Sequence, residues 1–161
     1  MEQFDSLKDL ARHSRYATYA TVNEDGSPHN SPMFYIPSER FDKLYMGTHP
    51  ESLHAKNMVR TGQAFAVIFG RTPHGSTGVY FKIENFHEVS EAELPEALAA
   101  HNAARALLGK DALPLEYYQS PNPQRMYVGD IVEISTNDAE RGSDGRLAKD
   151  VRFVIPASDL Q

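Results

Sequence analysis

The segment from Thr48 to Asn57 has residue types and spacing that suit the binding of a phosphate group. Thr48 and Glu51 have the spacing of a capping box, so a helix is expected to begin here and to run to about Arg60. The N-terminus of a helix supplies unpaired backbone N–H groups and a positive dipole potential, which together favour a phosphate. The alternative is a surface helix that these residues merely cap, with the other side chains solvated.

Three polar side chains in this segment support the phosphate hypothesis. Ser52 adds a hydroxyl donor, protonated His54 adds positive charge, and Asn57 adds an amide that fixes the local backbone. His54 and Asn57 share one side of a helix, whereas Lys56 is separated from His54 by more than half a turn. We therefore favour His54 with Asn57, over Lys56, as the phosphate-binding residues.

The composition disfavours several other chemistries. The chain has no cysteine, which excludes disulfides, thiol nucleophiles, iron–sulfur clusters and cysteine-based zinc sites, so redox chemistry needs a bound cofactor. The seven histidines show neither a His-Glu-x-x-His pattern nor dense carboxylate spacing, and we expect no metal site. His101 is expected to be structural and His74 exposed in a Gly-rich loop. No Gly-x-Ser-x-Gly motif is present, which disfavours a serine hydrolase.

Length and charge narrow the class of protein. The 161 residues suit a single domain spanning 1–161. With 22 acidic and 16 basic residues the net charge is -6, and no run of Lys or Arg suits nucleic acid or a membrane surface. The N-terminus is acidic, and no stretch reaches the roughly 20 apolar residues of a membrane helix. We expect a cytoplasmic protein.

The first part of the chain predicts one helix and three strands. Phe4, Leu7 and Leu10 recur at helical spacing and predict a short amphipathic helix over 4–14. Asp25-Gly26 lies between two strand-like runs and predicts an antiparallel hairpin. The three strands, expected to form a β-meander, are 17–22, 30–36 and 43–48. Gly62 is expected to end the helix that follows them.

The rest of the chain completes a mainly β fold. A capping box at Ser90 and Glu93 predicts a second helix that ends near Gly109. The prolines in 110–124 predict a long irregular segment, which could act as a lid. Within it, Tyr117-Tyr118 is expected to pack against the body of the protein. The remaining strands are expected over 64–69, 79–89, 125–135 and 150–155, with loops at 70–78 and around Gly142 and Gly145. Six or seven strands with two or three helices, and no regular βα alternation, predict an antiparallel β-barrel.

A series of short motifs in residues 1–90 resembles a known family. The motifs are Ala20-Thr21-Val22, Asp25-Gly26-Ser27-Pro28, Ser31-Pro32-Met33-Phe34, Tyr45-Met46-Gly47-Thr48 and Ser52-Leu53-His54-Ala55-Lys56-Asn57-Met58. Their order and spacing resemble the FMN-binding split barrels of the pyridoxamine 5'-phosphate oxidase-like superfamily. The resemblance implies a split β-barrel, FMN as the cofactor, and a homodimer with two cofactor sites across its interface.

The resemblance also implies nine cofactor-binding residues. The residues expected to contact the flavin, partly through backbone groups, are Ser31, Pro32, Met33 and Phe34. The residues expected to surround the phosphate and ribityl chain are Thr48, His49, Ser52, His54 and Asn57. The true pyridoxamine phosphate oxidases carry basic residues where this chain has Ser31, Ile36 and His54, and this chain has no tryptophan near its C-terminus or elsewhere. The likeness is therefore to the broader group of small flavoproteins.

Two functions follow from that likeness. The first is an FMN-dependent oxidoreductase that transfers hydride or electrons between a reduced donor and a small organic substrate, with the chemistry carried by the flavin. The second is a non-catalytic protein that binds flavin, deazaflavin or haem for storage or sensing. No catalytic residue is assigned, and Arg125 is expected to form a surface ion pair rather than to reach a partner's cofactor.

Overall fold

The computed structural model describes residues 2–72, 75–141 and 147–161. Its elements run in chain order as α1 (Glu2–His13), β1 (Tyr16–Val22), β2 (Pro28–Phe34), β3 (Ile36–Pro37), β4 (Lys43–Thr48), α2 (Leu53–Thr61), β5 (Ala64–Thr72), β6 (Gly75–Glu88), α3 (Leu94–Ala106), the 3-10 helix η1 (Leu115–Tyr118), β7 (Arg125–Arg141), β8 (Leu147–Val154) and the 3-10 helix η2 (Ala157–Leu160). The predicted mainly β class with antiparallel pairing is confirmed.

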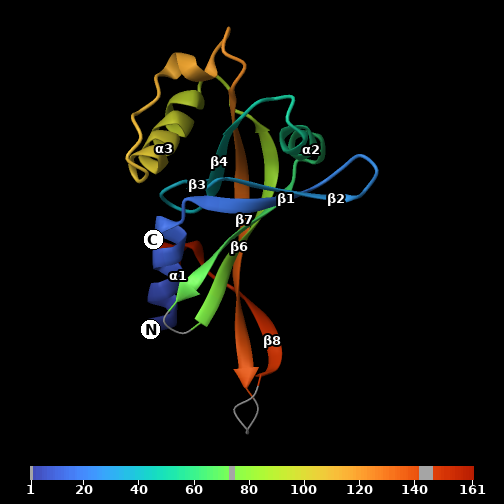
Figure 1. Cartoon of the computed structure of the whole chain (residues 1–161), viewed down its shortest axis with the longest axis vertical. Coiled ribbons are helices and arrows are strands. Elements are labelled where there is room, and N and C mark those ends of the chain that lie inside the picture. Colours follow the sequence, from blue (N-terminus) through green and yellow to red (C-terminus); the bar gives the residue numbers. More distant parts are fainter. Residues whose placement is uncertain (1, 73–74, 142–146) are drawn as a thin grey trace.

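The strands form one antiparallel sheet in the order β2-β1-β5-β6-β7-β4-β3, and β8 pairs with β7 beyond this path (Figure 1). Tyr35 alone separates β2 from β3. The two strands therefore form one bent run that pairs with β1 at its start and with β4 at its end, which brings the two edges of the sheet together as a barrel. The consecutive antiparallel pairing expected of a β-meander is present, but the bend makes the middle run pair with its two neighbours over different residues.

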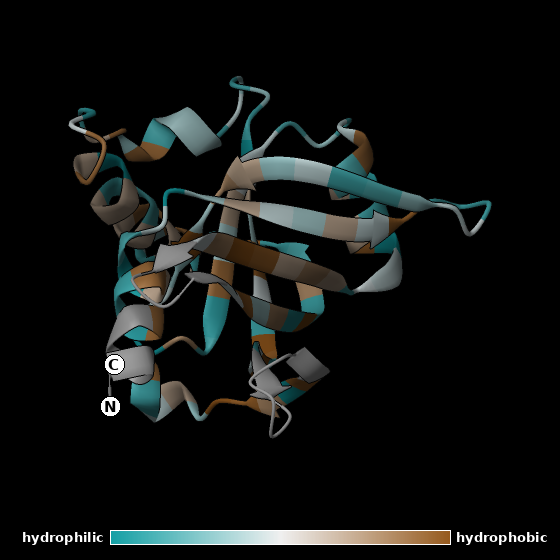
Figure 2. Cartoon of the chain, turned by 60° about the horizontal axis from the view of Figure 1, so that its bottom comes forward, coloured by the Kyte–Doolittle hydropathy of each residue, from teal (hydrophilic) through white to brown (hydrophobic). Residues whose placement is uncertain are grey.

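Alternating side chains fill the barrel. Along β1 the inward residues Ala17, Tyr19 and Thr21 are buried, as a half-buried strand requires. Helix α1 closes one end through Leu7 and Ala11, which are buried in the same core. Figure 2 shows the hydrophobic residues concentrated along the central strands.

Helix α3 covers a second, smaller core outside the barrel. Leu94 and Leu98 of α3 pack with Ile36, Tyr45 and Tyr118, which come from β3, β4 and η1. The carboxylate of Glu93 accepts a bond of 2.9 Å from the backbone N–H of Ser90, as a capping box predicts, although α3 begins only at Leu94.

Several predicted boundaries differ from the structure. Thr48 is the last residue of β4, and α2 begins at Leu53 with Ser52 as its N-cap, because Thr48 pairs with Arg125 of β7 instead of starting a helix. Strands β5 and β6 occupy most of the predicted 70–78 loop. His74, within that loop, and the loop around Gly142 and Gly145 lie outside the described residues.

Two further features match the sequence. Gly62 ends α2 with φ 67°, the left-handed conformation that glycine adopts without strain. No helix in the described part of the chain is long and apolar enough to cross a membrane.

Candidate functional site

Thr48, Ser52 and His54 form one contact group at the start of α2, which we call the hydroxyl–imidazole cluster. His54 Nε2 lies 2.8 Å from Thr48 Oγ1 and 3.0 Å from Ser52 Oγ, and the two hydroxyl oxygens are 3.3 Å apart. Thr48 is buried, whereas Ser52 and His54 are partly exposed. The last residue of β4 and the first turn of α2 thus bring together three of the nine predicted residues.

The N-terminus of α2 has no side-chain cap. Ser52 occupies the N-cap position, but its hydroxyl donates to the carbonyl of His49 at 2.7 Å instead of accepting from the helix. The first amides of a helix have no acceptor within the helix, so an uncapped terminus presents them to a ligand. Together with the dipole, this arrangement suits an anion next to the hydroxyl–imidazole cluster.

Asn57 anchors α2 to the barrel. Its amide nitrogen donates to Thr21 Oγ1 at 3.2 Å and to Asn23 Oδ1 at 2.7 Å, and the side chain is buried. Both amide hydrogens are therefore used within the protein. Asn57 holds the helix at a fixed position against β1, which is a positioning role.

The four β2 residues predicted to contact a flavin point to two sides of the strand. Ser31 and Met33 alternate with Pro32 and Phe34, as successive residues of a strand do. Met33 packs against the barrel core, whereas Phe34 packs against the second core under α3. A ligand that contacts all four residues would therefore have to use the backbone of β2, as the sequence analysis expected in part.

His49 and Lys56 lie apart from the cluster. The ring of His49 accepts a bond of 3.1 Å from the backbone N–H of Glu51, and its side chain is exposed. Lys56 Nζ forms an ion pair with Glu51 at 2.6 Å. The preference for His54 over Lys56 as a neighbour of Thr48 and Ser52 agrees with these contacts.

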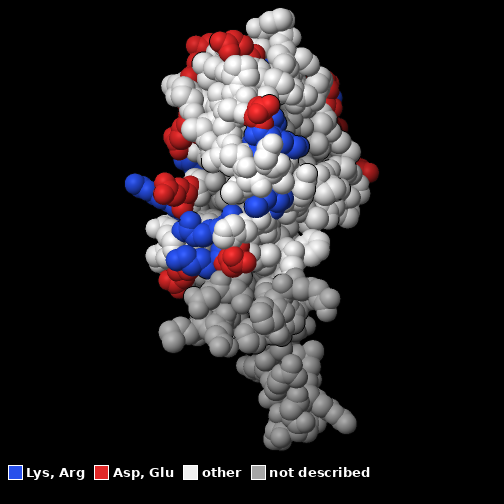
Figure 3. Space-filling view, turned by 60° about the vertical axis from the view of Figure 1, so that its left-hand side comes forward, with Lys and Arg blue, Asp and Glu red and all other residues white. Residues whose placement is uncertain are grey.

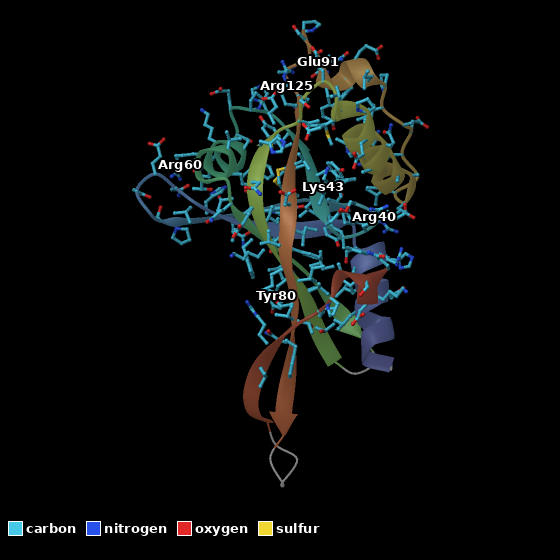
Figure 4. The ribbon with its side chains drawn as sticks, turned by 180° about the vertical axis from the view of Figure 1, so that it is seen from behind. Arg40, Lys43, Arg60, Tyr80, Glu91 and Arg125 are labelled. Carbon is cyan, nitrogen blue, oxygen red and sulfur yellow. The ribbon has the colours of Figure 1, made fainter. Side chains whose placement is uncertain are left out.

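A cavity of about 780 Å³ adjoins α2. Its lining includes Lys56, Asn57 and Arg60 of the helix, together with Glu88 and Tyr127 of β6 and β7. Figure 4 shows Arg60 on α2 and Arg125 at the start of β7, toward the same end of the molecule. Arg125 forms an ion pair with Glu88 at 3.5 Å, the surface pair that the sequence analysis expected.

His29 is a site residue that the sequence reasoning missed. It lies on β2 with Ser31, and its Nε2 is 2.9 Å from Ser31 Oγ. Burial, and secondly the charge of His29, hold the pKa of His54 below its ordinary value. The alternation of β2, which places residues 29 and 31 on one side, was the signal that pointed to it.

The structure also accounts for residues given structural roles. His101 is buried and its Nδ1 lies 2.8 Å from the hydroxyl of Tyr118, so the expected structural role is confirmed. Burial is the main cause that lowers the pKa of His101 to about 4. Tyr118 packs on the protein body, also as expected. Within the described ranges, no three His, Asp or Glu side chains are grouped to hold a metal ion.

A second cavity, of about 750 Å³, lies on the other side of the molecule between α1, the 38–43 loop and α3. Its lining carries Arg12, Arg40 and Lys43 beside alanines of α3. Basic side chains gather near the middle of this face, with acidic side chains among them (Figure 3). This mixed cavity contains none of the nine predicted residues.

Comparisons with known proteins identify the fold. No family model and no curated protein sequence matches the chain. The structure of a heme binding protein from Mycobacterium smegmatis matches with a TM-score of 0.67 and 17% identity, over 98% of this chain and 59% of that one, so this chain spans little more than half its length. An FAD-binding protein from Mesorhizobium loti matches with a TM-score of 0.58 and 16% identity, over 81% of this chain and 91% of that one.

A protein of the pyridoxinephosphate oxidase family from Clostridium acetobutylicum, related to general stress protein 26, matches over the whole length. Its TM-score is 0.59 at 12% identity, over 100% of this chain and 99% of that one. At such identities the likeness establishes the fold. This chain has the split β-barrel that the order of its motifs indicated.

Proposed function

We propose that this split-barrel chain binds FMN, with the phosphate held at the uncapped start of α2. The observation that carries the proposal is the hydroxyl–imidazole cluster beside that terminus, where His54 lies 2.8 Å from Thr48 Oγ1. The free amides of α2 and the hydroxyl of Thr48 donate to phosphate oxygens, and His54 adds charge when protonated. Asn57 keeps the helix in register with β1.

Strand β2 would hold the ring of the flavin. It lies at one end of the strand order and pairs with β1 alone, so one row of its backbone groups faces away from the sheet. These groups suit the polar edge of an isoalloxazine ring. A bound flavin supplies hydride or electron transfer between a reduced donor and a small organic substrate. The protein's part is to bind, to orient the ring and to limit the access of water.

We also propose that the working unit is a homodimer with a cofactor site at each end of its interface. Strand β8 pairs only with β7, off the main strand order, so one of its edges is free, and Val154 at its end is 69% exposed. Phe69 on β5 is 71% exposed. A second copy that covers these strands would remove exposed apolar surface and free strand edges together.

Molar mass in solution tests the dimer. Light scattering after size-exclusion chromatography should give about twice the 18.0 kDa of one chain. Val154→Glu should shift the mass toward one chain, while Leu107→Glu at the residue that follows α3, also an exposed position, should leave it unchanged. A single-chain mass for the unaltered protein would refute the dimer.

A non-catalytic role with haem is the second candidate. The observation that favours it is the presence of His29 on β2 and His54 on α2, which packs against β2, because imidazole is a common axial ligand of haem iron. One structural neighbour is described as a heme binding protein. A storage or sensing protein would hold its ligand without turning over a substrate.

Absorption spectroscopy separates these candidates. The purified protein is incubated with FMN, riboflavin or haem, passed through a desalting column, and its visible spectrum is recorded. FMN bands retained after the column, with riboflavin largely lost, support the phosphate site. A retained haem spectrum without retained FMN supports the second candidate. Multiple turnovers of a nicotinamide donor by the FMN-loaded protein support an oxidoreductase, and their absence supports storage.

A further inference from the structure

We propose that His29 is a second anion-binding imidazole of this site, so that a phosphate binds together with protons and is released as the pH rises. The inference rests on the proposed phosphate site at α2. It adds a residue that the sequence motifs did not assign and a pH dependence to the binding of the ligand.

The register of the β1–β2 hairpin places His29 at the site. His29 is the cross-strand neighbour of Thr21, and Ser31 is that of Tyr19. Asn57 of α2 donates to Thr21 Oγ1, so this part of the helix lies against the same stretch of β1. Cross-strand neighbours lie about 5 Å apart on one face of a sheet. His54, which precedes Asn57 by three residues, is brought near His29 in this way.

The hydroxyl groups determine which imidazole nitrogen can accept a proton. The hydroxyl of Ser52 donates to the carbonyl of His49 at 2.7 Å, so toward His54 it can only accept. His54 Nε2 must therefore carry the hydrogen that it shares between Ser52 and Thr48. A second proton would enter at Nδ1 and would make the ring a cation. His29 Nε2 lies 2.9 Å from Ser31 Oγ.

Charged side chains on α2 and on the strands that pack against it form ion pairs that do not include His29 or His54. Strands β1, β2 and β6 pack against this helix. Besides His29 of β2, these strands carry the ionisable residues Tyr16, Tyr19, Tyr80, Lys82, Glu84, His87 and Glu88. The pairs formed within the described residues are Lys82 with Glu84, His87 with Glu93, Glu88 with Arg125, and Lys56 with Glu51 on the helix side. No carboxylate forms an ion pair with His29 or His54 within the described part of the chain.

A phosphate would supply the missing counter-charge. In the free protein, burial and the charge of His29 lower the pKa of His54, so protonating both rings at once is unfavourable. A phosphate dianion near both rings reverses that balance and raises both pKa values. Binding then takes up protons, and the affinity falls as the pH rises through the range where the liganded rings lose them. Permanently charged Arg or Lys side chains would give no such dependence.

The first experiment follows the histidines by NMR, with inorganic phosphate as the probe. The ring C–H shifts of His29 and His54 are titrated from pH 5 to 9 with and without phosphate, and His13, exposed on α1, serves as the internal control. We expect phosphate to raise the midpoints of His29 and His54 and to leave that of His13 unchanged. Unshifted midpoints for His29, or no binding of phosphate at any pH, would overturn the inference.

The second experiment measures FMN affinity against pH. For one linked proton the dissociation constant should rise by up to about tenfold per pH unit above neutrality, and riboflavin, which has no phosphate, should show no such slope. His29→Gln should flatten the slope, while His13→Gln should not. FMN binding with an unchanged slope in His29→Gln contradicts the inference and leaves the flavin site standing. Phosphate-linked shifts without FMN binding at any pH contradict the flavin proposal and leave the imidazole pair standing.

Discussion

Gly47 in β4 is a position where adding a single methyl group should have a large effect. A Cβ atom added there would lie 3.0 Å from Cζ of Tyr118 and closer still to its hydroxyl oxygen. Real Cβ atoms do not approach other atoms so closely, so Gly47→Ala must displace the ring. Tyr118 is buried and its hydroxyl contacts His101 Nδ1 at 2.8 Å, so displacing the ring disturbs this buried contact.

The expected loss of stability can be worked from these contacts. Breaking a buried hydrogen bond costs about 1–3 kcal/mol, and forcing an extra methyl group into a packed site costs about 1–3 kcal/mol. The two costs overlap, because moving the ring is what breaks the hydrogen bond. Replacing a glycine by alanine within a strand itself stabilises the folded state by about 0.5–1 kcal/mol, which offsets part of the loss. We expect a net loss of about 2 kcal/mol, or a melting temperature lower by roughly 4–8 °C for a chain of this size.

Urea unfolding followed by circular dichroism measures this loss, with Gly70→Ala as the matched control. At Gly70 the nearest atom to the added Cβ is a methyl group of Leu10 at 3.0 Å, the end of a flexible side chain, so we expect a change below about 0.5 kcal/mol. Tyr118→Phe removes the hydroxyl, so the double variant with Gly47→Ala should lose less than the sum of the single losses. Additive losses, or a Gly47→Ala variant as stable as the unaltered protein, would refute the reasoning.

Two further predictions concern His101 and Asn57. An unfolded histidine has a pKa of about 6.5, whereas burial lowers the pKa of His101 to about 4, so between these values the unfolded state binds more protons. The free energy of unfolding should therefore fall as the pH is lowered from 6.5 to 4, and His101→Gln should weaken that dependence; identical pH profiles would contradict the assignment. Asn57→Ala should lower the free energy of unfolding by about 1–3 kcal/mol, because it leaves buried Thr21 and partly buried Asn23 without the amide donor. Chemical denaturation measures it, and an unchanged midpoint would show that the anchor is not needed.

The elements that the sequence predicted well have signals within a few residues. The alternation of β1, the Asp25-Gly26 turn and the glycine at 62 each act locally, and each is found in the structure. Asp25 Oδ1 accepts the backbone N–H of Ser27 at 2.9 Å, which stabilises the turn on its own residues. The first hairpin could therefore be predicted from contacts among neighbouring residues alone.

The elements that were misjudged depend on distant partners. Thr48 carries a capping signal, yet it pairs with Arg125 as the last residue of β4, which the strand predicted over 43–48 already included, and α2 starts only at Leu53. The predicted strand 30–36 is divided at Tyr35 into β2 and β3, because β3 pairs with β4. No pattern in the neighbouring residues indicates that pairing. His29 was missed because the family motif on this strand begins at Ser31. The alternation of side chains along β2 nevertheless places His29 and Ser31 on the same side of the strand.

The affinity of FMN compared with riboflavin tests the central claim most directly, since the two ligands share the ring and differ in the phosphate. Fluorescence titration of the unaltered protein at pH 7 should give at least about tenfold tighter binding of FMN, the effect of about 1.4 kcal/mol at the start of α2. His54→Ala should remove most of that preference, and His13→Ala should keep it. Equal affinity for the two flavins, or a preference that survives His54→Ala, would contradict a phosphate site at the hydroxyl–imidazole cluster.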